Sequence, residues 1–322
     1  MSRVLRASGA EAVDPGLRDR FLEAGNHLRA PASRLPTADA GYAEVVLGLL
    51  GGRAYELLLA EDGGDVVGRA VVAVASEPDT VTMGLYEASE GERGDGATRG
   101  ILEAAEGFAR DHGRTRIVAP VDASTWMAYR FRLPDDEPQA DGGRTFGWEP
   151  SHPQAYLDRF LEAGFEPVLE YETLGVVFPE RGPYRIGDAA AETRPAAEAA
   201  RSTGYRLARL RDHREALPWE DLHALSSRAF AENPLYEPLP LEVFRAAYGR
   251  ALGDAAADFT FWCRDPDGAL AAVVCAFRDG GAAVVKSIAV SPEHRGRHLS
   301  TALIHHLLAA AEPAGVHEMI SA

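Results

Sequence analysis

The sequence contains little lysine and little positive charge overall. Lys286 is its single lysine, and 33 basic residues face 49 acidic ones, which gives a formal net charge of -16 at pH 7. Nucleic acids and anionic membrane surfaces attract basic proteins, so a chain this acidic is a poor general ligand for either. We therefore expect neither nucleic acid nor a membrane among its partners.

Cysteine and long hydrophobic runs are also scarce. The two cysteines, Cys263 and Cys275, fall in expected strands and have neither the number for a disulfide framework nor the spacing of metal ligands. We interpret both as buried, reduced thiols and expect no metal site. No apolar run reaches the roughly 18–20 residues that cross a bilayer, and the N-terminus lacks the apolar core of a signal peptide. These absences favour a cytoplasmic protein.

The size and composition indicate a folded chain of two domains. A length of 322 residues suggests two domains of ordinary size, and a hydrophobic content of 46% is enough for packed cores. The C-terminal half has the clearer pattern, with Asp265-Pro-Asp-Gly268 as a strong hairpin turn. Its predicted elements are a strand at 205–210, a helix around 222–230, a helix at 241–252, strands at 259–264, 269–278 and 284–290, and a helix from 299.

The most informative stretch runs from Val284 to Ile304. Residues 284–290 form an apolar run typical of a buried strand, and Ser291-Pro-Glu293 ends it. The basic loop His294-Arg-Gly-Arg-His298 follows, and leucines then recur at helical spacing. Backbone amides at a helix N-terminus have no intrahelical partner and carry partial positive charge, to which the two arginines add. Strand, basic turn and helix together predict a site for a phosphorylated ligand.

At these residues the chain resembles the GNAT N-acetyltransferase superfamily. The signature of that family, Arg/Gln-x-x-Gly-x-Gly/Ala, wraps the pyrophosphate of acetyl-coenzyme A, and Arg295 takes its first position. Ala289-Val290 end the preceding strand as they often do in the family, and the predicted order β-α-α-β-β-β-α is that of the GNAT core. His298 stands at the central glycine position and Ser300 at the last small position. A histidine there requires either a tolerable backbone φ or a phosphate held further away.

The resemblance implies that acetyl-coenzyme A, or another acyl-coenzyme A, is the co-substrate. It also implies that a backbone N–H of the strand end meets the thioester carbonyl as an oxyanion donor. The residues that it assigns to the coenzyme are Ile288, Ala289, Val290, Arg295, Gly296, Arg297, His298, Leu299, Ser300 and Thr301. The oxyanion donor is one of the first three.

Four residues are candidates for catalysis. Ser287 falls where some relatives carry an acidic residue, and it could relay a proton through water. Lys286 would be charged at its reference pKa of about 10.4 and inactive as a base unless desolvated, so an ion pair at the cleft edge is the simpler interpretation. Because side chains alternate along a strand, we expect these two on opposite faces. Tyr236 and Glu237 lie in the loop 232–240, where the family usually has its acceptor site, and could bind or deprotonate the acceptor or simply belong to an exposed loop.

The N-terminal half predicts a degenerate copy of the same plan. Its loop Glu90-Gly-Glu-Arg-Gly-Asp-Gly-Ala97 keeps the family spacing at Arg93 and Gly96, but three acidic residues surround the place of the phosphates. Like charges about 4 Å apart repel by about 1 kcal/mol in water and by more near a protein surface. We therefore assign the coenzyme to the C-terminal half. The N-terminal half then shapes the acceptor cleft, holds a homodimer together, or does both.

These patterns predict an α+β fold of two tandem GNAT-like domains with mixed α/β sheets. We expect a degenerate domain over residues 1–178, closed by a strand at 171–178, a linker over 179–203 and a coenzyme-binding domain over 204–322. The last residues, Glu318-Met-Ile-Ser-Ala322, predict a fifth strand, and the family's next helix and last two strands do not follow it. We therefore expect either that the sequence is cut short or that another chain completes the second domain. The fifth strand would then be an exposed sheet edge, and the catalytic acid cannot be named from this sequence.

The leading functional hypothesis is an acyl-coenzyme A-dependent N-acyltransferase. The resemblance implies acetyl as the expected acyl group and a small-molecule amine as the acceptor. The alternative is a non-catalytic acyl-coenzyme A-binding or scaffold protein, which His298, the missing segment and the degenerate first half favour. Binding of the coenzyme without release of its thiol would support the alternative. Nothing in the sequence identifies the amine.

Overall fold

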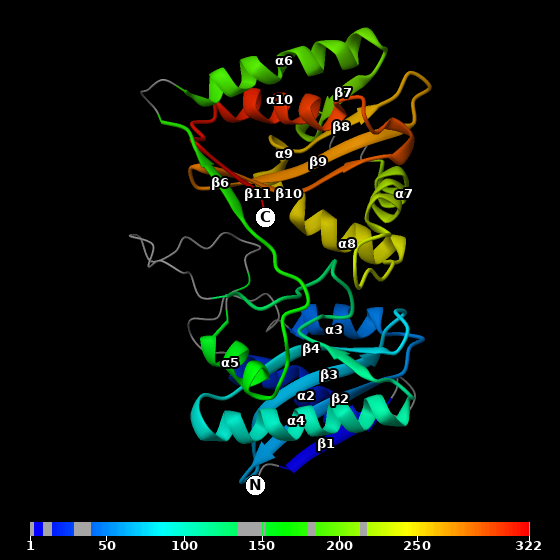
Figure 1. Cartoon of the computed structure of the whole chain (residues 1–322), viewed down its shortest axis with the longest axis vertical. Coiled ribbons are helices and arrows are strands. Elements are labelled where there is room, and N and C mark those ends of the chain that lie inside the picture. The colour runs from blue at the N-terminus through cyan, green and yellow to red at the C-terminus, as the bar shows by residue number, and fades with distance from the viewer. Residues whose placement is uncertain are drawn as a thin grey trace. The chain divides into compact units, whose positions relative to one another are not determined.

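The computed structural model describes residues 3–8, 15–28, 40–133, 150, 152–179, 184–212 and 218–321. These residues form two compact units, each built on one β-sheet with helices on both faces (Figure 1). Unit 1 holds the described residues up to Val168 and the short segment Asn233–Pro238, and unit 2 holds Leu169–Glu232 and the chain from Leu239 onward. Two mixed sheets with flanking helices confirm the predicted fold class.

Unit 1 alternates strands and helices around a five-stranded sheet. In chain order its elements are β1 (Arg3–Ser8), α2 (Pro15–Leu28), α3 (Ala40–Leu49), β2 (Tyr55–Asp62), β3 (Asp65–Val74), β4 (Thr80–Ala88), α4 (Gly91–Asp111), β5 (Arg116–Val118) and α5 (Gln154–Glu162). The strand order in the sheet is β1-β2-β3-β4-β5. Neighbouring strands are antiparallel except β4 and β5, which run parallel because α4 carries the chain back between them.

The strands of unit 1 are apolar on both faces because helices cover both. Leu57 and Leu59 of β2 pack in the cluster that includes α2 and α3, whereas Leu58 and Ala60 pack in the cluster that includes α4 and α5. Side chains alternate between the two faces of a strand, so consecutive leucines reach different cores. A continuous apolar strand is therefore consistent with a sheet buried on both sides.

Unit 2 repeats this plan around a six-stranded sheet. In chain order its elements are β6 (Leu174–Val177), α6 (Ile186–Ser202), β7 (Arg206–Arg209), α7 (Trp219–Phe230), α8 (Leu241–Ala251), α9 (Asp254–Ala257), β8 (Phe261–Arg264), β9 (Leu270–Asp279), β10 (Ala282–Val290), a 3₁₀ turn (Pro292–His294), α10 (Leu299–Ala311) and β11 (Glu318–Ser321). The strand order is β6-β11-β10-β9-β8-β7. β10 and β11 run parallel, and the other neighbours run antiparallel.

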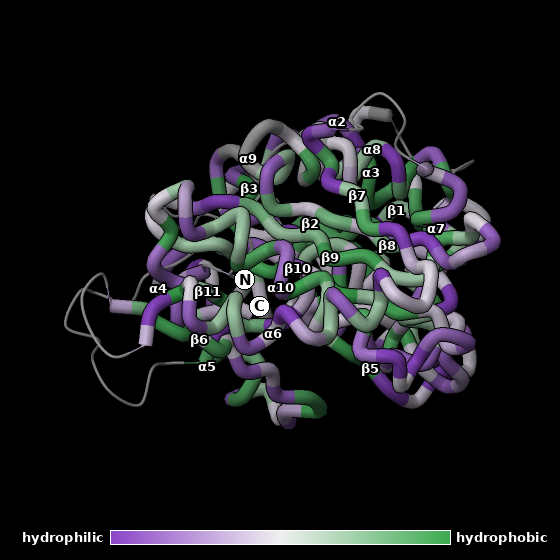
Figure 2. Tube along the Cα trace, turned by 90° about the horizontal axis from the view of Figure 1, so that it is seen from above, coloured by the Kyte–Doolittle hydropathy of each residue, from purple (hydrophilic) through white to green (hydrophobic). Residues whose placement is uncertain are grey.

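Helices also cover both faces of the sheet of unit 2. α6 and α10 lie side by side on one face, and α7 and α8 lie on the other (Figure 1). Ala272, Val274 and Ala276 of β9 pack on the α6–α10 side, whereas Val273 and Cys275 face α7 and α8. β9 is accordingly hydrophobic along its length (Figure 2). The elements predicted between residues 205 and 321 are all present, with bounds that shift by at most a few residues.

The strand predicted to close the N-terminal domain belongs to unit 2. The sequence predicts that strand at 171–178, but β6 pairs antiparallel with β11, with Leu174 opposite Ser321 and Val177 opposite Glu318. β11 consequently has a strand on each side and is not the exposed sheet edge that the sequence predicts. An apolar pattern identifies a strand but not its neighbour, because pairing is decided by contacts far away in sequence.

The predicted linker contains a helix that belongs to the core of unit 2. α6 buries Ile186, Ala189, Ala190, Ala197 and Ala200, and it packs against α10. Alanines allow this close packing and also favour the helix itself. Since β6 and α6 both lie in unit 2, the two compact units differ from the predicted boundaries at 178 and 204. Residues 180–183 of the predicted linker lie outside the described residues.

Two elements of unit 1 have no counterpart in the sequence predictions. β1 is the strand next to β2, and α3 packs against α2. α4 begins at Gly91, inside the stretch 90–97 that is predicted from the sequence as a loop. The apolar spacing of the sequence does not show this helix start, because the charged first turn, Glu92 to Asp95, interrupts that spacing.

Neither a membrane helix nor a metal cluster occurs in the described residues. No described helix combines the length and the apolar character that a bilayer crossing requires. In the same part of the chain, no group of three or more His, Cys, Asp or Glu side chains lies close enough together to hold a metal ion.

Candidate functional site

The centre of the candidate site is an irregularity in β10. Val285 lies opposite Ala276 of β9 and Ser287 lies opposite the next residue, Cys275, so Lys286 is an extra residue in a β-bulge. Val285 packs on the α6–α10 side, whereas Ser287 is hydrogen-bonded to Tyr248 on the other side. The prediction that Lys286 and Ser287 lie on opposite faces assumed a regular strand, and the bulge breaks the alternation on which it relied.

Beyond the bulge, β10 continues past the last described residue of its parallel neighbour β11. In the described residues β10 pairs with β11 only from Ala282 to Val285. The N–H of Ser291 donates to the carbonyl oxygen of Ala271 at 2.8 Å, so Ser291 faces β9. Backbone groups alternate in direction along a strand, and Ile288 and Val290 therefore direct their N–H and C=O groups away from β9. Of the three predicted oxyanion donors, Ile288 and Val290 thus point their N–H groups away from β9, and that of Ala289 points toward it.

The loop after β10 leads into the N-terminus of α10. Arg295 is extended, Gly296 has φ +74° and His298 has φ +58°, after which the helix starts at Leu299. The first intrahelical bond runs from the N–H of Ala302 to the carbonyl of His298 at 3.0 Å. The amides of residues 299–301 precede that bond, and the N-cap residue provides no side-chain cap for them. Their exposed donors and the helix dipole favour an anion.

His298 meets the conformational demand of the family's central glycine. Its φ of +58° and ψ of +25° lie in the left-handed region, which residues with a Cβ atom rarely adopt. Of the two sequence-based alternatives, a tolerable φ or a more distant phosphate, the backbone thus adopts the first. Arg295 and Arg297 are both exposed, and Nη1 of Arg297 donates to the hydroxyl of Tyr205 at 3.0 Å.

Ser287 lies in a small polar group on the α7–α8 side of the sheet. Burial raises the pKa of Tyr248 well above its usual range, and its hydrogen bond with Ser287 reduces that effect. Burial also raises the pKa of Cys275 to about 11, against the opposing effects of Ser287 and Lys286. Both groups are therefore neutral near pH 7. The spacing of the sequence does not reveal the contribution of Tyr248, because α8 reaches β10 only in the folded chain.

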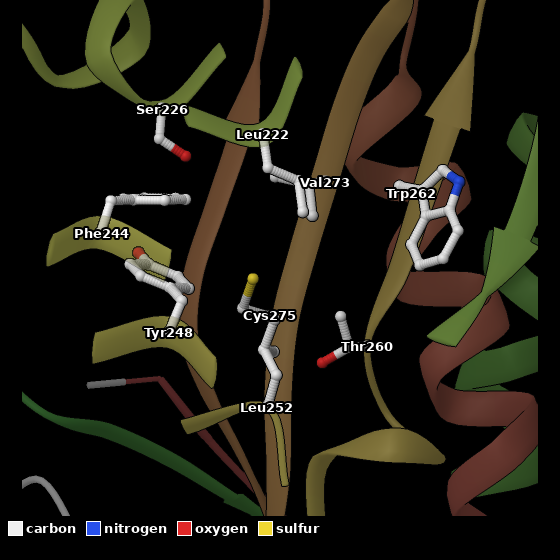
Figure 3. A pocket seen from close by; sticks show the side chains of 9 residues that line it. All are labelled: Leu222, Ser226, Phe244, Tyr248, Leu252, Thr260, Trp262, Val273 and Cys275. Carbon is white, nitrogen blue, oxygen red and sulfur yellow. The ribbon is translucent and has the colours of Figure 1, made fainter. Parts of the chain in front are cut away.

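A narrow cavity adjoins this group. Phe244 and Tyr248 of α8 stack over one another and face β9, and the lining is otherwise mostly apolar (Figure 3). Its volume is about 10 Å³, close to the least that one water molecule needs. The remaining lining residues are Leu222, Ser226, Leu252, Thr260, Trp262, Val273 and Cys275. The cavity is a packing defect of the core and is too small for an acceptor molecule.

Tyr236 and Glu237 belong to unit 1 by their contacts. The carboxylate of Glu237 accepts hydrogen bonds from the backbone N–H of Ser76 at 2.7 Å and forms an ion pair with Arg53 at 2.9 Å. Tyr236 forms an edge contact with Trp126, with 6.2 Å between ring centroids. A carboxylate held by these donors is stabilised as an anion. The acceptor-side role of the two residues remains a prediction.

Unit 1 offers a direct comparison for the open edge of β10. The N–H of Ser89 donates to Val67 of the neighbouring strand, as the N–H of Ser291 does in unit 2, so Ala88 corresponds to Val290. In unit 1 the hydroxyl of Tyr156 accepts from the N–H of Ala88 and donates to its C=O, both at 3.0 Å. A side chain of α5 therefore occupies this backbone edge in unit 1.

A side chain of α5 also contacts the segment between β4 and α4 of unit 1. The guanidinium of Arg159 donates to the carbonyl oxygens of Ser89 and Gly91 at 3.0 and 3.3 Å and pairs with Asp95 at 2.8 Å. Arg93, which keeps the family spacing, pairs with two aspartates of the β2–β3 turn, at 3.2 and 3.0 Å. No arginine of this loop is thus directed to a phosphate. The spacing of Tyr156 and Phe160 predicts only a helix, so the sequence gives no signal for the blocking role of Tyr156 or Arg159.

Comparison with known proteins identifies the C-terminal part. Residues 219–322 match the profile of the acetyltransferase (GNAT) family. The protein carries a GNAT-family acyltransferase domain. Proteins of this family use an acyl-coenzyme A as co-substrate. No curated protein matches the chain.

Several solved structures resemble the chain over nearly its whole length. A GCN5-related N-acetyltransferase from Sphaerobacter thermophilus is 13% identical, with 99% of this chain and 85% of that chain covered and a TM-score of 0.44. A tandem GNAT protein from the clavulanic acid biosynthesis pathway is 15% identical, with 99% and 89% covered and a TM-score of 0.46. A probable N-acyltransferase of unknown function from Enterococcus faecalis is 8% identical, with 100% and 65% covered and a TM-score of 0.54. The last likeness supports the fold of this GNAT protein and nothing beyond it.

Proposed function

We propose that unit 2 transfers an acyl group, with acetyl preferred, from coenzyme A to the amine of a small molecule. The observation that carries this proposal is the contrast between equivalent backbone positions of the two units. In unit 1, Tyr156 and Arg159 occupy the strand edge and the loop. In the described part of unit 2, the N-cap residue provides no side-chain cap for the amides of α10, and Arg295 and Arg297 are exposed.

The loop and the first turn of α10 suit the diphosphate of the coenzyme. The amides of Leu299, Ser300 and Thr301 are uncapped donors at the positive end of a 13-residue helix. Arg295 and Arg297 add two exposed positive charges beside it. Anions at a helix N-terminus gain typically 0.3–1 kcal/mol at an exposed site, or roughly double that when partly buried. Two arginines that neutralise a diphosphate add charge-assisted hydrogen bonds to this gain.

The open edge of β10 suits the amide-containing arm and the thioester. The N–H and C=O groups of Ile288 and Val290 point away from β9, and an extended chain with amide groups can pair with them as a strand would. An N–H of this edge that donates to the thioester carbonyl would stabilise the oxyanion. A preorganised donor of this kind is worth roughly 2.7–4 kcal/mol of barrier.

The transfer itself needs a neutral amine and a place for one proton. The amine nitrogen attacks the thioester carbonyl carbon, the carbon–sulfur bond breaks, and the coenzyme leaves as a thiolate that must be protonated. Ser287, which is hydrogen-bonded to Tyr248, is the first candidate to pass a proton through water. Lys286 is the second candidate, and Glu237 and Tyr236 are the acceptor-side candidates. Each is tested by its alanine variant, and unchanged turnover and coenzyme affinity would remove that residue from the mechanism.

Calorimetric titration with acetyl-coenzyme A tests the assignment. Arg295→Ala and Arg297→Ala are each expected to weaken binding about tenfold, which corresponds to about 1.4 kcal/mol. Arg93→Ala is the control, because it removes the arginine that keeps the family spacing in unit 1, where it lies in the first turn of α4. Equal losses for Arg93→Ala and Arg295→Ala would contradict the assignment to unit 2.

Turnover separates the enzyme from a binding protein. Acetyl-coenzyme A and a panel of small amines are incubated with the protein, and the released coenzyme thiol is measured with a chromogenic disulfide. Amine-dependent thiol release supports acyl transfer. Tight coenzyme binding without thiol release for any amine would favour the non-catalytic alternative, which His298 at the family's glycine position supports.

A further inference from the structure

The hydroxyl of Tyr205 joins the two ends of the basic loop. Tyr205 directly precedes β7 and is only 3% exposed. Its hydroxyl oxygen lies 3.0 Å from Nη1 of Arg297 and 2.9 Å from Nδ1 of His294. These two residues begin and end the turn that contains Arg295 and Gly296. One buried hydroxyl is therefore bonded on both sides of the segment that we assign to the diphosphate.

The directions of these hydrogen bonds follow from the chemistry of the groups. A guanidinium has donors and no acceptor, so Arg297 donates to the oxygen of Tyr205. In the tautomer of His294 that carries its proton on Nε2, the hydroxyl donates its own proton to Nδ1. Nε2 of His294 faces Oδ2 of Asp265 at 3.5 Å, and a carboxylate there favours that tautomer. The result is a directed chain from Arg297 through Tyr205 and His294 to Asp265.

Asp265, the last residue of this series of hydrogen bonds, lies in the β8–β9 turn. The side chain of Asp265 is largely buried, and its Oδ1 accepts the N–H of Ala269 at 2.8 Å. This carboxylate therefore cannot follow His294 if the loop moves. The rings of Tyr205 and His294 also meet edge to face, with 5.7 Å between centroids. The loop is thus tied to a rigid hairpin on one side and to the start of β7 on the other.

The loop needs such a support because its backbone is unfavourable. Two of its residues, Gly296 and His298, have left-handed φ values of +74° and +58°. Glycine adopts this conformation freely, but a histidine does not. Without outside contacts, the segment before α10 would relax toward other conformations, and the helix amides and arginines would lose their common orientation.

We propose that Tyr205 is a positioning residue that preorganises the basic loop for the diphosphate of the acyl-coenzyme A. The inference rests on the proposed function, since it assumes that this loop binds the coenzyme. Tyr205 touches neither the acyl group nor the acceptor in this arrangement. Its loss is therefore expected to raise the Kd and the KM for acyl-coenzyme A and to leave kcat unchanged.

The first test is Tyr205→Phe, which keeps the buried ring and removes only the hydroxyl. We expect the Kd for acetyl-coenzyme A to rise about tenfold in calorimetry, the size of one lost hydrogen bond to a charged group. Tyr184→Phe is the matched control, since that hydroxyl donates to Glu192 on the exposed side of α6. An unchanged Kd for Tyr205→Phe, or an equal rise for Tyr184→Phe, would overturn the proposal.

A double-mutant cycle and a rescue variant separate positioning from general destabilisation. In the Arg297→Ala background, Tyr205→Phe should cost less than it does alone, because its link to Arg297 is already gone. His298→Gly should recover part of the affinity of Tyr205→Phe, because glycine adopts the left-handed conformation without a supporting contact. The proposal that Tyr205 acts through the loop would be contradicted by two results together: additive effects of Tyr205→Phe and Arg297→Ala on the affinity, and no recovery of affinity with His298→Gly.

Arg295→Ala distinguishes this proposal from the proposed function. Weaker binding for Arg295→Ala with no change for Tyr205→Phe would leave the coenzyme site in place and reject Tyr205 as its positioning residue. A wild-type protein that does not bind acetyl-coenzyme A at all would reject both proposals together.

Discussion

The hydroxyl of Tyr156 lies 3.0 Å from both the amide nitrogen and the carbonyl oxygen of Ala88. One side chain thereby satisfies both backbone groups at the position that corresponds to Val290 in unit 2. Tyr156 is buried, so these backbone groups have no access to water in its place. The contact explains in physical terms why the sheet of unit 1 offers no open edge there.

Removal of this hydroxyl should destabilise unit 1 without an effect on the coenzyme. Tyr156→Phe leaves the buried N–H and C=O of Ala88 without a partner, which costs about 1–3 kcal/mol. Urea unfolding should show this loss, and the Kd for acetyl-coenzyme A should stay at the wild-type value. Coenzyme binding that weakens in proportion to the loss of stability would argue that unit 1 shares the coenzyme site.

The ion pair of Arg69 with Glu87 should be the most sensitive charged contact of unit 1. The two side chains are 0% and 3% exposed, and Nη1 of Arg69 also donates to the carbonyl of Phe21 at 2.7 Å. Glu87→Gln leaves a buried guanidinium without its counter-charge, and we expect a loss of about 3–5 kcal/mol in the free energy of unfolding. Glu106→Gln breaks an exposed pair with Arg110 and should cost less than about 1 kcal/mol. Similar losses for both variants would contradict this account.

Asp122 should make stability fall as pH rises through the weakly acidic range. Burial raises the pKa of its carboxyl from 3.8 to about 6, although it accepts from the N–H of Leu85 and pairs with Tyr42. The folded state then holds the proton more tightly than the unfolded state. The stabilising effect of protonation is complete below pH 3.8 and is lost as pH rises to about 6, a change of about 3 kcal/mol.

The variant D122N isolates this titration from all others. Its free energy of unfolding, minus that of the wild type, should increase between pH 4 and pH 7 and then stay level. Denaturant unfolding at several pH values measures the difference. A difference that does not change with pH would show that Asp122 titrates alike in the folded and unfolded states.

The two cysteines should be unreactive until the protein unfolds. Burial raises the pKa of Cys263 to about 12 and that of Cys275 to about 11, so almost no thiolate is present at pH 8. A chromogenic disulfide reagent should label neither thiol in the native protein and both in guanidinium. Rapid labelling of the native protein would contradict the buried positions. Slow labelling also means that the thiol-release assay measures the thiol of the released coenzyme and not the cysteines of the protein.

The sequence alone determined the local elements of this protein. The apolar run from Val284 to Val290, the break at Pro292 and the leucine spacing after His298 specify strand, turn and helix, because side-chain period and proline chemistry act over a few residues. The same local pattern carried the GNAT resemblance and the choice of loop for the coenzyme. The acidic residues around Arg93 would repel phosphates, and for this reason the sequence assigned the coenzyme to the C-terminal half.

The tertiary structure decided which neighbours complete these elements. No local pattern reveals that β6 pairs with β11, that the alanine-rich α6 packs on α10, or that Lys286 is the extra residue of a bulge. The side chains that fill one site and support the other, Tyr156 and Tyr205, act on residues 68 and 89 positions away. Such contacts depend on how distant segments pack, since backbone edges and buried hydroxyls find partners only when the whole chain has folded.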